Sequence, residues 1–235
     1  MNQMLLTLAL AVIPIVIAIT LHEAAHGYVA WALGDDTAKV AGRLSLNPLV
    51  HVDPVGTLLL PGILLIGQLL TIGHVAFMFG WAKPVPVDAR RFRNPRRMMA
   101  VVAAAGPVMN FFLAWVGALA LYGLPYLSDA GAQVGLDFIR LFIIVNLGLG
   151  LFNLIPIPPL DGGRIAVGIL PLPMAIAWAR LERAGIFIVM LVVFLLPSLL
   201  RDIGIPFDPV RQTLGALIPG ALRLVLQLAG HNVGT

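Results

Sequence analysis

Two histidines and a glutamate lie close together in the stretch "HEAAH", and they are the residues in this sequence best suited to carry out chemistry. His22 and His26 are four positions apart, so on a helix they share one face and both imidazoles can reach a single cation. Glu23 follows His22 directly, where its carboxylate can reach a water molecule bound to that cation. The H-E-x-x-H spacing therefore predicts a zinc site with Glu23 as the general base.

A catalytic zinc ion usually has three protein ligands and an open position for water, so the sequence has to supply a third ligand. The chain has no cysteine, which leaves histidine and carboxylate side chains. Asp161 differs from the other acids because it follows "NLIPIPP" and precedes Gly162 and Gly163. The prolines prevent a regular helix, and the glycines allow close backbone approach, so this stretch can hold a carboxylate rigidly. The alternative is that Asp161 caps a helix.

Two other polar residues, His51 and Asp53 in "NPLVHVDP", are further candidates. They could hold the metal ligands in place or control the access of water. The alternative is that both belong to a simple turn near the membrane interface.

The elements that must position these residues are membrane spans. The chain is 60% hydrophobic and 11% charged, with a mean hydropathy of +0.97, whereas soluble chains carry about 25% charged residues. These values predict an all-α polytopic membrane protein without a separate soluble domain. Four spans are expected, at residues 4–33, 98–124, 134–155 and 185–200. Residues 165–184 look interfacial, and the C-terminal 28 residues of the sequence form a weakly amphipathic segment.

The hydrophobic stretch 55–80 is expected to follow a re-entrant path. Lys39 and Arg43 precede it, and five arginines between positions 90 and 97 follow it. Because basic residues flank spans on the cytoplasmic side, both groups should lie in the cytoplasm, and the stretch should enter the membrane and return on the same side. The alternative is an ordinary span with one basic group on the unexpected side.

Three motifs, in this order, resemble those of the site-2 proteases, which are intramembrane zinc metalloproteases of peptidase family M50. They are "HEAAH" at 22–26, "GPVMN" at 106–110 and "NLIPIPPLDGG" at 153–163. In addition, "FGWAKPVPV" at 79–87 is similar to the segment that precedes the intervening core helix in compact members of that family. The resemblance covers residues 5–165.

The resemblance implies a three-helix catalytic core plus extra spans, with a re-entrant element that could include a small membrane-embedded β-hairpin. It implies one transmembrane protease domain over 1–235, with the core at 5–165 and C-terminal spans and an amphipathic segment at 166–235. Compared with many relatives, a PDZ-like insertion and a CBS-type tail are missing from this sequence. One Zn²⁺ per chain is implied. The residues it assigns are His22, His26 and Asp161 as metal ligands, Glu23 as the catalytic base, and Asn110 and Asn153 as substrate contacts.

The implied activity is zinc-dependent intramembrane endopeptidase action on a transmembrane protein or peptide, with the lipid bilayer as the other partner. We expect a multi-pass protein of a prokaryotic cytoplasmic membrane, with its active site toward the cytoplasm. The net charge of +4 comes from basic residues that flank spans, so no nucleic-acid partner is expected. The rival function is a non-proteolytic membrane scaffold that retains a zinc site, and the intact Glu23 argues against it. The sequence leaves the oligomeric state open.

Overall fold

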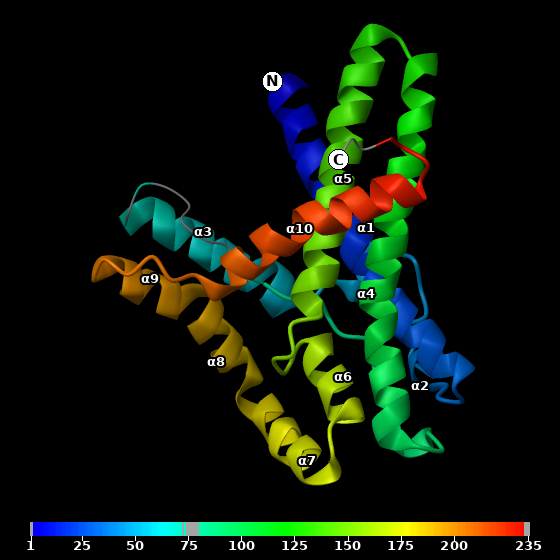
Figure 1. The fold of residues 1–235 in the computed structure, drawn as a ribbon, viewed down its shortest axis with the longest axis vertical. Coiled ribbons are helices and arrows are strands. Elements are labelled where there is room, and N and C mark those ends of the chain that lie inside the picture. The colour runs from blue at the N-terminus through cyan, green and yellow to red at the C-terminus, as the bar shows by residue number, and fades with distance from the viewer. Residues whose placement is uncertain (1, 72, 74–79, 233–235) are drawn as a thin grey trace.

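The computed structural model describes residues 2–71, 73 and 80–232. Its centre is a bundle of three long helices, α1 (Asn2–Ala32), α4 (Pro95–Ala120) and α5 (Asp129–Asn153). These helices pack against one another in all three pairings (Figure 1). The described residues contain no β-strand, so the predicted all-α architecture with a three-helix core is confirmed for them.

The starts of α4 and α5 follow from their local sequence. The Asn94 side chain accepts a hydrogen bond from the backbone N–H of Arg97 at 3.4 Å, and Pro95 occupies the first turn of α4. The Ser128 hydroxyl accepts from the backbone N–H of Gly131 at 3.3 Å at the start of α5. Both are preferred N-terminal arrangements, because they satisfy amide groups that the helix itself leaves free. A 3₁₀ turn (Leu121–Tyr126) joins the two helices as antiparallel neighbours.

Small residues allow these helices to approach closely. Ala114 and Ala118 of α4 are fully buried against Ile143 and Leu147 of α5. In membranes, helices associate through such close packing of small side chains, since lipid tails are as apolar as the helices themselves. The C-terminal helix α10 (Pro209–Leu228) packs on the outside of this cluster.

Five described segments are long and apolar enough to cross a membrane, which supports a multi-pass protein. The segments are Val12–Ala32, Pro54–Thr71, Pro95–Tyr126, Asp129–Asn153 and Leu172–Arg201. The last one differs from the sequence prediction, which separated an interfacial part from a span at residue 185. In the structure α7 (Leu172–Arg180), α8 (Gly185–Met190) and α9 (Leu196–Asp202) follow one another as a single bent helical arm, linked by a 3₁₀ turn (Leu181–Ala184) and a π-type turn (Leu191–Leu195). The charged residues between α7 and α8 lie in this 3₁₀ turn at the surface, where Glu182 pairs with Arg164 at 2.8 Å.

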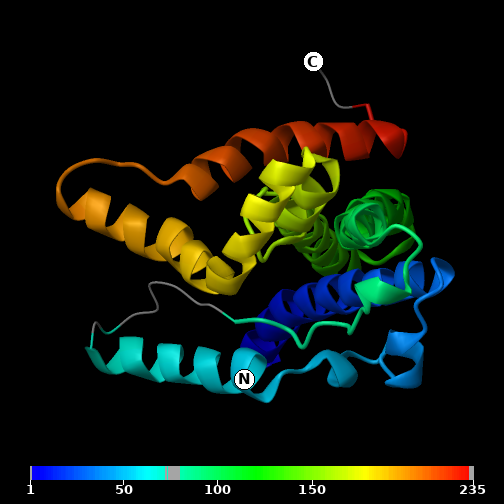
Figure 2. The same cartoon turned by 90° about the horizontal axis from the view of Figure 1, so that it is seen from below.

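The stretch after α1 leaves the bundle and comes back to it. After α2 (Thr37–Val40) and a 3₁₀ turn (Pro48–His51), a π-type turn (Pro54–Leu59) leads into α3 (Leu60–Thr71), which extends away from the three-helix core. The described chain resumes at residue 80 and runs toward α1 (Figure 2). Residues 80–88, named the return segment below, form neither helix nor strand and precede a 3₁₀ turn (Ala89–Arg91).

The two ends of this excursion are in contact. The backbone N–H of Trp81 donates to the carbonyl oxygen of Gly56 at 3.1 Å. The Arg43 guanidinium donates to the carbonyl oxygen of Lys83 at 2.7 Å. These contacts favour the predicted re-entrant path over a single crossing. The predicted β-hairpin falls partly on residues 72 and 74–79, which lie outside the described residues.

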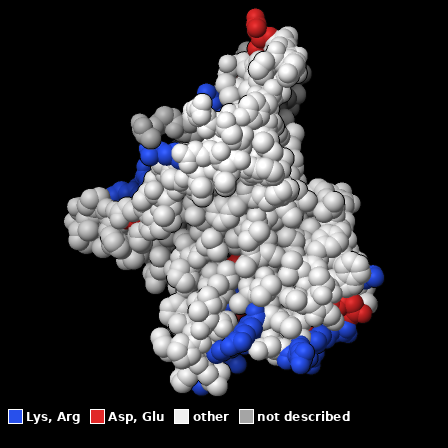
Figure 3. Space-filling model, turned by 45° about the vertical axis from the view of Figure 1, so that its right-hand side comes forward, with Lys and Arg blue, Asp and Glu red and all other residues white. Residues whose placement is uncertain are grey.

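Charged side chains gather toward the ends of the molecule. Figure 3 shows most Lys and Arg side chains of the visible face at its lower end, with acidic side chains beside them, further basic side chains on the upper left flank, and acidic side chains at the upper tip. In Figure 1 the lower end holds α2, the start of α4 and α7, whereas the upper tip holds the turn between α4 and α5. Basic side chains gathered at one end are typical of a protein that spans a bilayer.

Single cysteines can test the re-entrant path, because the sequence has none of its own. Val40, which is 80% exposed, precedes the excursion, and the exposed Arg93 follows it. We expect Val40→Cys and Arg93→Cys to react with a membrane-impermeant thiol reagent from the same side. Tyr126→Cys, at the opposite tip and 89% exposed, should react from the other side. Labelling of positions 40 and 93 from opposite sides would show that residues 55–80 cross the membrane once.

Candidate active site

Helix α1 carries two imidazoles and a carboxylate toward one point in the bundle. The rings of His22 and His26 stand nearly perpendicular, with centroids 4.7 Å apart. One candidate ligand atom from each of His22, Glu23 and His26 lies within 4.8 Å of the other two. The helical spacing of four residues is what stacks the two imidazoles on one face.

Asp161 reaches the same point from a distant part of the sequence. It is the first residue of α6 (Asp161–Ile169), and its Oδ2 lies 3.0 Å from His22 Nε2 and 3.4 Å from His26 Nε2. This oxygen is buried, and no described residue gives it a hydrogen bond of good geometry. The N-cap position belongs to Leu160, so Asp161 does not cap the helix. Its carboxylate is turned toward the two histidines instead.

The glycines after Asp161 make this position possible. A Cβ atom on Gly162 would lie 2.3 Å from the carbonyl oxygen of Leu154, and one on Gly163 would lie 2.6 Å from the nitrogen of Pro158. Both distances are far inside van der Waals contact, so only glycine allows the start of α6 to pack on the loop that precedes it.

Helix α4 fixes the other side of both imidazoles. His22 Nδ1 lies 2.6 Å from Asn110 Oδ1, and His26 Nδ1 lies 2.7 Å from the carbonyl oxygen of Val102. Both partners are acceptors, so both Nδ1 atoms carry a hydrogen and both Nε2 atoms present a lone pair. Gly106 lies between these contacts, and a Cβ there would be 2.5 Å from His22 and 2.6 Å from His26. The missing side chain at Gly106 lets the helix approach both rings.

The convergence of these groups fits a zinc ion. Two imidazole Nε2 lone pairs meet the buried Oδ2 of Asp161, which no described residue satisfies. Two imidazole nitrogens and one carboxylate oxygen form a three-ligand set typical of catalytic zinc, and the fourth position remains for water. Hydrogen bonds to the remaining imidazole nitrogens are the usual support for such ligands.

Glu23 is held by the return segment. Its Oε2 accepts a hydrogen bond from the backbone N–H of Val85 at 3.1 Å. The far end of the segment is anchored to Asp35, which is fully buried at the end of α1 and accepts from the backbone N–H of Asp88 at 2.7 Å. Hydrogen bonds from Arg90 lower the pKa of Asp88 to about 2. The return segment therefore lies across the candidate site.

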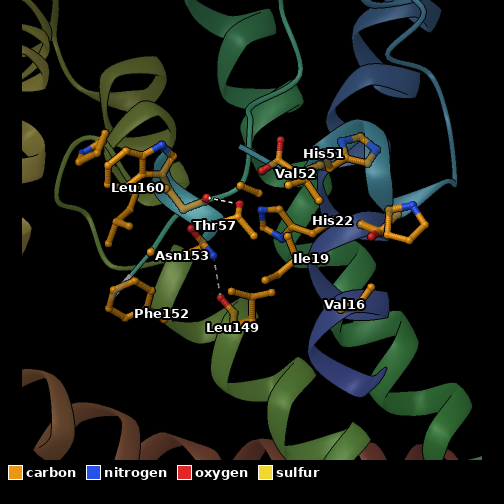
Figure 4. A pocket seen from close by; sticks show the side chains of 18 of the residues that line it. Val16, Ile19, His22, His51, Val52, Thr57, Leu149, Phe152, Asn153 and Leu160 are labelled. Atoms are coloured by element: carbon orange, nitrogen blue, oxygen red, sulfur yellow. Dashed lines mark hydrogen bonds between the residues drawn. The ribbon is translucent and has the colours of Figure 1, made fainter. Parts of the chain in front are cut away.

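A largely apolar cavity of about 550 Å³ opens beside these residues. His22 and Glu23 form part of its wall, together with side chains from α5 and α8 and from the start and end of the excursion (Figure 4). Asn153 lines it as well, with its amide donating to the carbonyl oxygen of Leu149 at 3.0 Å. A cavity of this size and character suits an apolar peptide side chain and a short length of backbone.

Comparison with known proteins identifies the chain. The family model of peptidase family M50 matches residues 126–196. A curated relative from Bacillus subtilis (strain 168), "Putative zinc metalloprotease YwhC", is 45% identical over 79% of this chain and 80% of its own. The like-named Rip2 of Mycolicibacterium smegmatis (strain ATCC 700084 / mc(2)155) is 32% identical over 62% of this chain and 51% of its own.

This chain belongs to peptidase family M50, the site-2 proteases. No solved structure gave a significant match. Membership makes the chain a zinc metalloprotease, and its apolar helices make it a multi-pass membrane protein. The M50 model covers the part of the chain with Asp161, and the H-E-x-x-H motif lies outside that part.

The two asparagines expected to contact substrate occupy different surroundings in this M50 chain. Asn153 lines the cavity, so a substrate could reach it, and its contact with substrate stays a prediction. Asn110 is fully buried behind His22, where its amide also donates to the carbonyl oxygen of Ala18 and to the side chain of Asn146. This geometry favours support of His22 over contact with substrate.

The candidates His51 and Asp53 also separate. His51 lines the cavity, is 3% exposed, and lies with Nε2 2.9 Å from the carbonyl oxygen of Ser45. Its own carbonyl oxygen accepts from the backbone N–H of Lys83, so it helps to hold the return segment. Asp53 accepts from two backbone N–H groups at the start of the π-type turn, as a capping residue does.

Several residues that shape the site had no role assigned from the sequence. Gly106 and Asn110 are four residues apart and therefore share a helix face. This spacing within "GPVMN" could have indicated that Gly106 lies close to the site. Asn146 is an amide in the middle of an apolar span, which is a known mark of functional or structural importance in membranes. The contact between Glu23 and Val85 left no local signal.

Proposed function

We propose that this protein is an intramembrane zinc endopeptidase that hydrolyses peptide bonds in or near the transmembrane segments of membrane-tethered substrates. The observation that carries the proposal is the meeting of His22, His26 and Asp161 beside Glu23, at the wall of an apolar cavity within a bundle of membrane helices. One zinc ion per chain is proposed, because these three ligands define a single site.

The proposed chemistry divides between the metal and the protein. When bound, zinc supplies a Lewis acid that lowers the pKa of a coordinated water toward about 7 and polarises a carbonyl group. Glu23 takes the proton of the attacking water and passes it to the leaving amine. Val85 holds one oxygen of the Glu23 carboxylate, which leaves the other oxygen to handle the proton. Asn153 lines the cavity, where its side chain can hold the substrate backbone.

The return segment is the proposed docking strand for the substrate. Lys83 and Val85 direct their N–H groups into the protein, to the His51 carbonyl oxygen and to Glu23. In an extended chain the backbone N–H and C=O groups of successive residues point to opposite sides, so those of the even-numbered residues point away from His51 and Glu23. Pro84 and Pro86 have no N–H to donate, and the carbonyl oxygen of Pro84 already lies 3.5 Å from the Arg43 guanidinium. An unwound substrate could pair there by β-addition, mainly as a donor.

The proposed location is a prokaryotic cytoplasmic membrane, with the site open toward the cytoplasm. The basic residues at the lower end in Figure 3 belong on the cytoplasmic side by the positive-inside rule. The proposed partners are the bilayer and a transmembrane protein or peptide, and no nucleic acid.

Zinc content and cleavage, measured together, test the proposal. The purified wild type should hold about one zinc per chain, and after reconstitution it should cut a single-span substrate with a Gly-Pro pair near its cytoplasmic end faster than a matched all-leucine span. Asp161→Ala should lose zinc and cleavage together. Asp137→Ala, whose carboxylate lies on the exposed face of α5, should keep both.

Three results would contradict the proposal. Wild type without zinc after metal-replete purification would remove the proposed metal centre, and with it both the protease and the zinc-retaining scaffold. Full zinc retention in Asp161→Ala would show that another group is the third ligand. Equal cleavage of both substrates would remove local unwinding from the mechanism.

A further inference from the structure

Two asparagine side chains are fully buried inside the helix bundle, next to the candidate metal ligands but away from the cavity. Asn110 of α4 and Asn146 of α5 each have an exposed fraction of 0%. Amides are rare inside membrane helices, because every unpaired donor or acceptor is costly where water is absent. One explanation is that the pair simply joins the two helices by a hydrogen bond. The directions of their hydrogen bonds indicate a more specific role.

The hydrogen bonds form a chain with a fixed direction. The Asn146 Nδ2 donates to the carbonyl oxygen of Phe142 at 2.8 Å, which turns Asn146 Oδ1 toward Asn110. That oxygen accepts from Asn110 Nδ2 at 3.0 Å, and the same Nδ2 also donates to the carbonyl oxygen of Ala18 at 3.2 Å. Because carbonyl oxygens can only accept, neither amide can be reversed without losing bonds.

The last bond of this chain reaches a metal ligand. Asn110 Oδ1 faces His22 Nδ1 at 2.6 Å, so His22 must carry its hydrogen on Nδ1 and present its lone pair on Nε2. Nε2 is the atom that points at Asp161. His26 gets the same orientation from the backbone of Val102. Of the two histidines, only His22 is oriented by a side chain, so a substitution in that hydrogen-bond chain can change its orientation.

We propose that Asn146 is a positioning residue for the metal site, acting through Asn110 to hold His22 in the tautomer and orientation that bind zinc. This inference rests on the zinc site of the proposed function. The side chain of Asn146 hydrogen-bonds to Asn110 and to the Phe142 carbonyl oxygen, and Asn146 is not among the residues that line the cavity. Its effect should appear as zinc affinity, since outer partners of this kind change metal affinity by about 10–100-fold.

Two substitutions of similar size separate positioning from helix joining. Asn146→Leu removes the acceptor for Asn110 but suits an apolar helix interface. Asn146→Asp keeps an acceptor oxygen for Asn110 Nδ2 in either protonation state, but places an acid in the bundle. If Asn146 only joins helices, stability and zinc binding should fall together, with the aspartate variant no better than the leucine variant.

The proposal predicts opposite orders for the two readouts. The zinc dissociation constant, measured in chelator-buffered solution, should rise about tenfold for Asn146→Leu and stay near the wild-type value for Asn146→Asp. The unfolding temperature of the zinc-free protein should be lower for Asn146→Asp than for Asn146→Leu. Ile143→Ala, one turn away on α5 and 3% exposed, should lower stability without changing zinc affinity.

Each contrary result has a distinct meaning. Unchanged zinc affinity in Asn146→Leu, or equal loss in both Asn146 variants, would overturn the positioning role while leaving the zinc site intact. A wild type that binds no zinc would overturn both this role and the proposed function.

Discussion

Glu23→Gln is expected to lower the rate of peptide hydrolysis by about 10²–10⁴-fold, while zinc stays bound. The amide has the shape of the carboxylate, and its oxygen can still accept the hydrogen bond from Val85 N that holds Glu23 now. It cannot take a proton from water at neutral pH, so only the base is removed. Cleavage of a reconstituted substrate and zinc per chain should be measured on the same preparation.

The sequence offers a matched control for this variant, because its other glutamate, Glu182, lies at the surface and pairs with Arg164. Glu182→Gln should leave cleavage unchanged. Activity retained in Glu23→Gln would show that Glu23 is not the base. Loss of zinc would instead make Glu23 a ligand, which its distance to both histidines also permits.

Gly106→Ala is expected to lower zinc affinity by about 10–100-fold, with a matching loss of cleavage. The added Cβ would lie 2.5 Å from His22 and 2.6 Å from His26, closer than side chains in proteins approach one another. Either α4 must move away or both rings must rotate, and each adjustment breaks the hydrogen bonds that fix the two Nδ1 atoms. Zinc competition with a chelator would measure the change.

A second glycine on α4 provides the control for this substitution. A Cβ on Gly117 would lie 2.9 Å from Ile143, so Gly117→Ala also strains the bundle, but against an apolar neighbour. It should lower the unfolding temperature and leave zinc affinity unchanged. Equal loss of zinc in both variants would indicate a general disturbance of the bundle, and the specific role of Gly106 would be wrong.

The parts of the structure that could be predicted depend on residues close together in the sequence. Hydropathy alone indicates the membrane spans, and the helix period places His22 and His26 on one face. Asp161 could be singled out because the prolines before it restrict the backbone and the two glycines after it allow close approach. The re-entrant path followed from the placement of basic residues, which is a property of composition rather than of packing.

The features that could not be predicted depend on contacts between residues far apart in the sequence. The hold of Val85 on Glu23 joins residues 62 positions apart, and the contact of Asn146 with Asn110 joins two different helices. The spacing of residue types along a helix or strand carries no information about such contacts. The sequence predicted an interfacial part and a separate span for the arm from α7 to α9, because the charges between α7 and α8 resemble a membrane boundary. In the structure a 3₁₀ turn at these charges links the two helices directly.

The hydrogen bond between Val85 and Glu23 has a consequence for the timing of product departure. A carboxylate accepts a hydrogen bond about twice as strongly as a neutral acid does. The return segment is therefore held most firmly before Glu23 takes a proton and most loosely while it carries one. Because Glu23 gives this proton to the leaving amine, the segment is loosest between the attack of water and the breaking of the peptide bond, and it is held firmly again when the cleaved peptide departs.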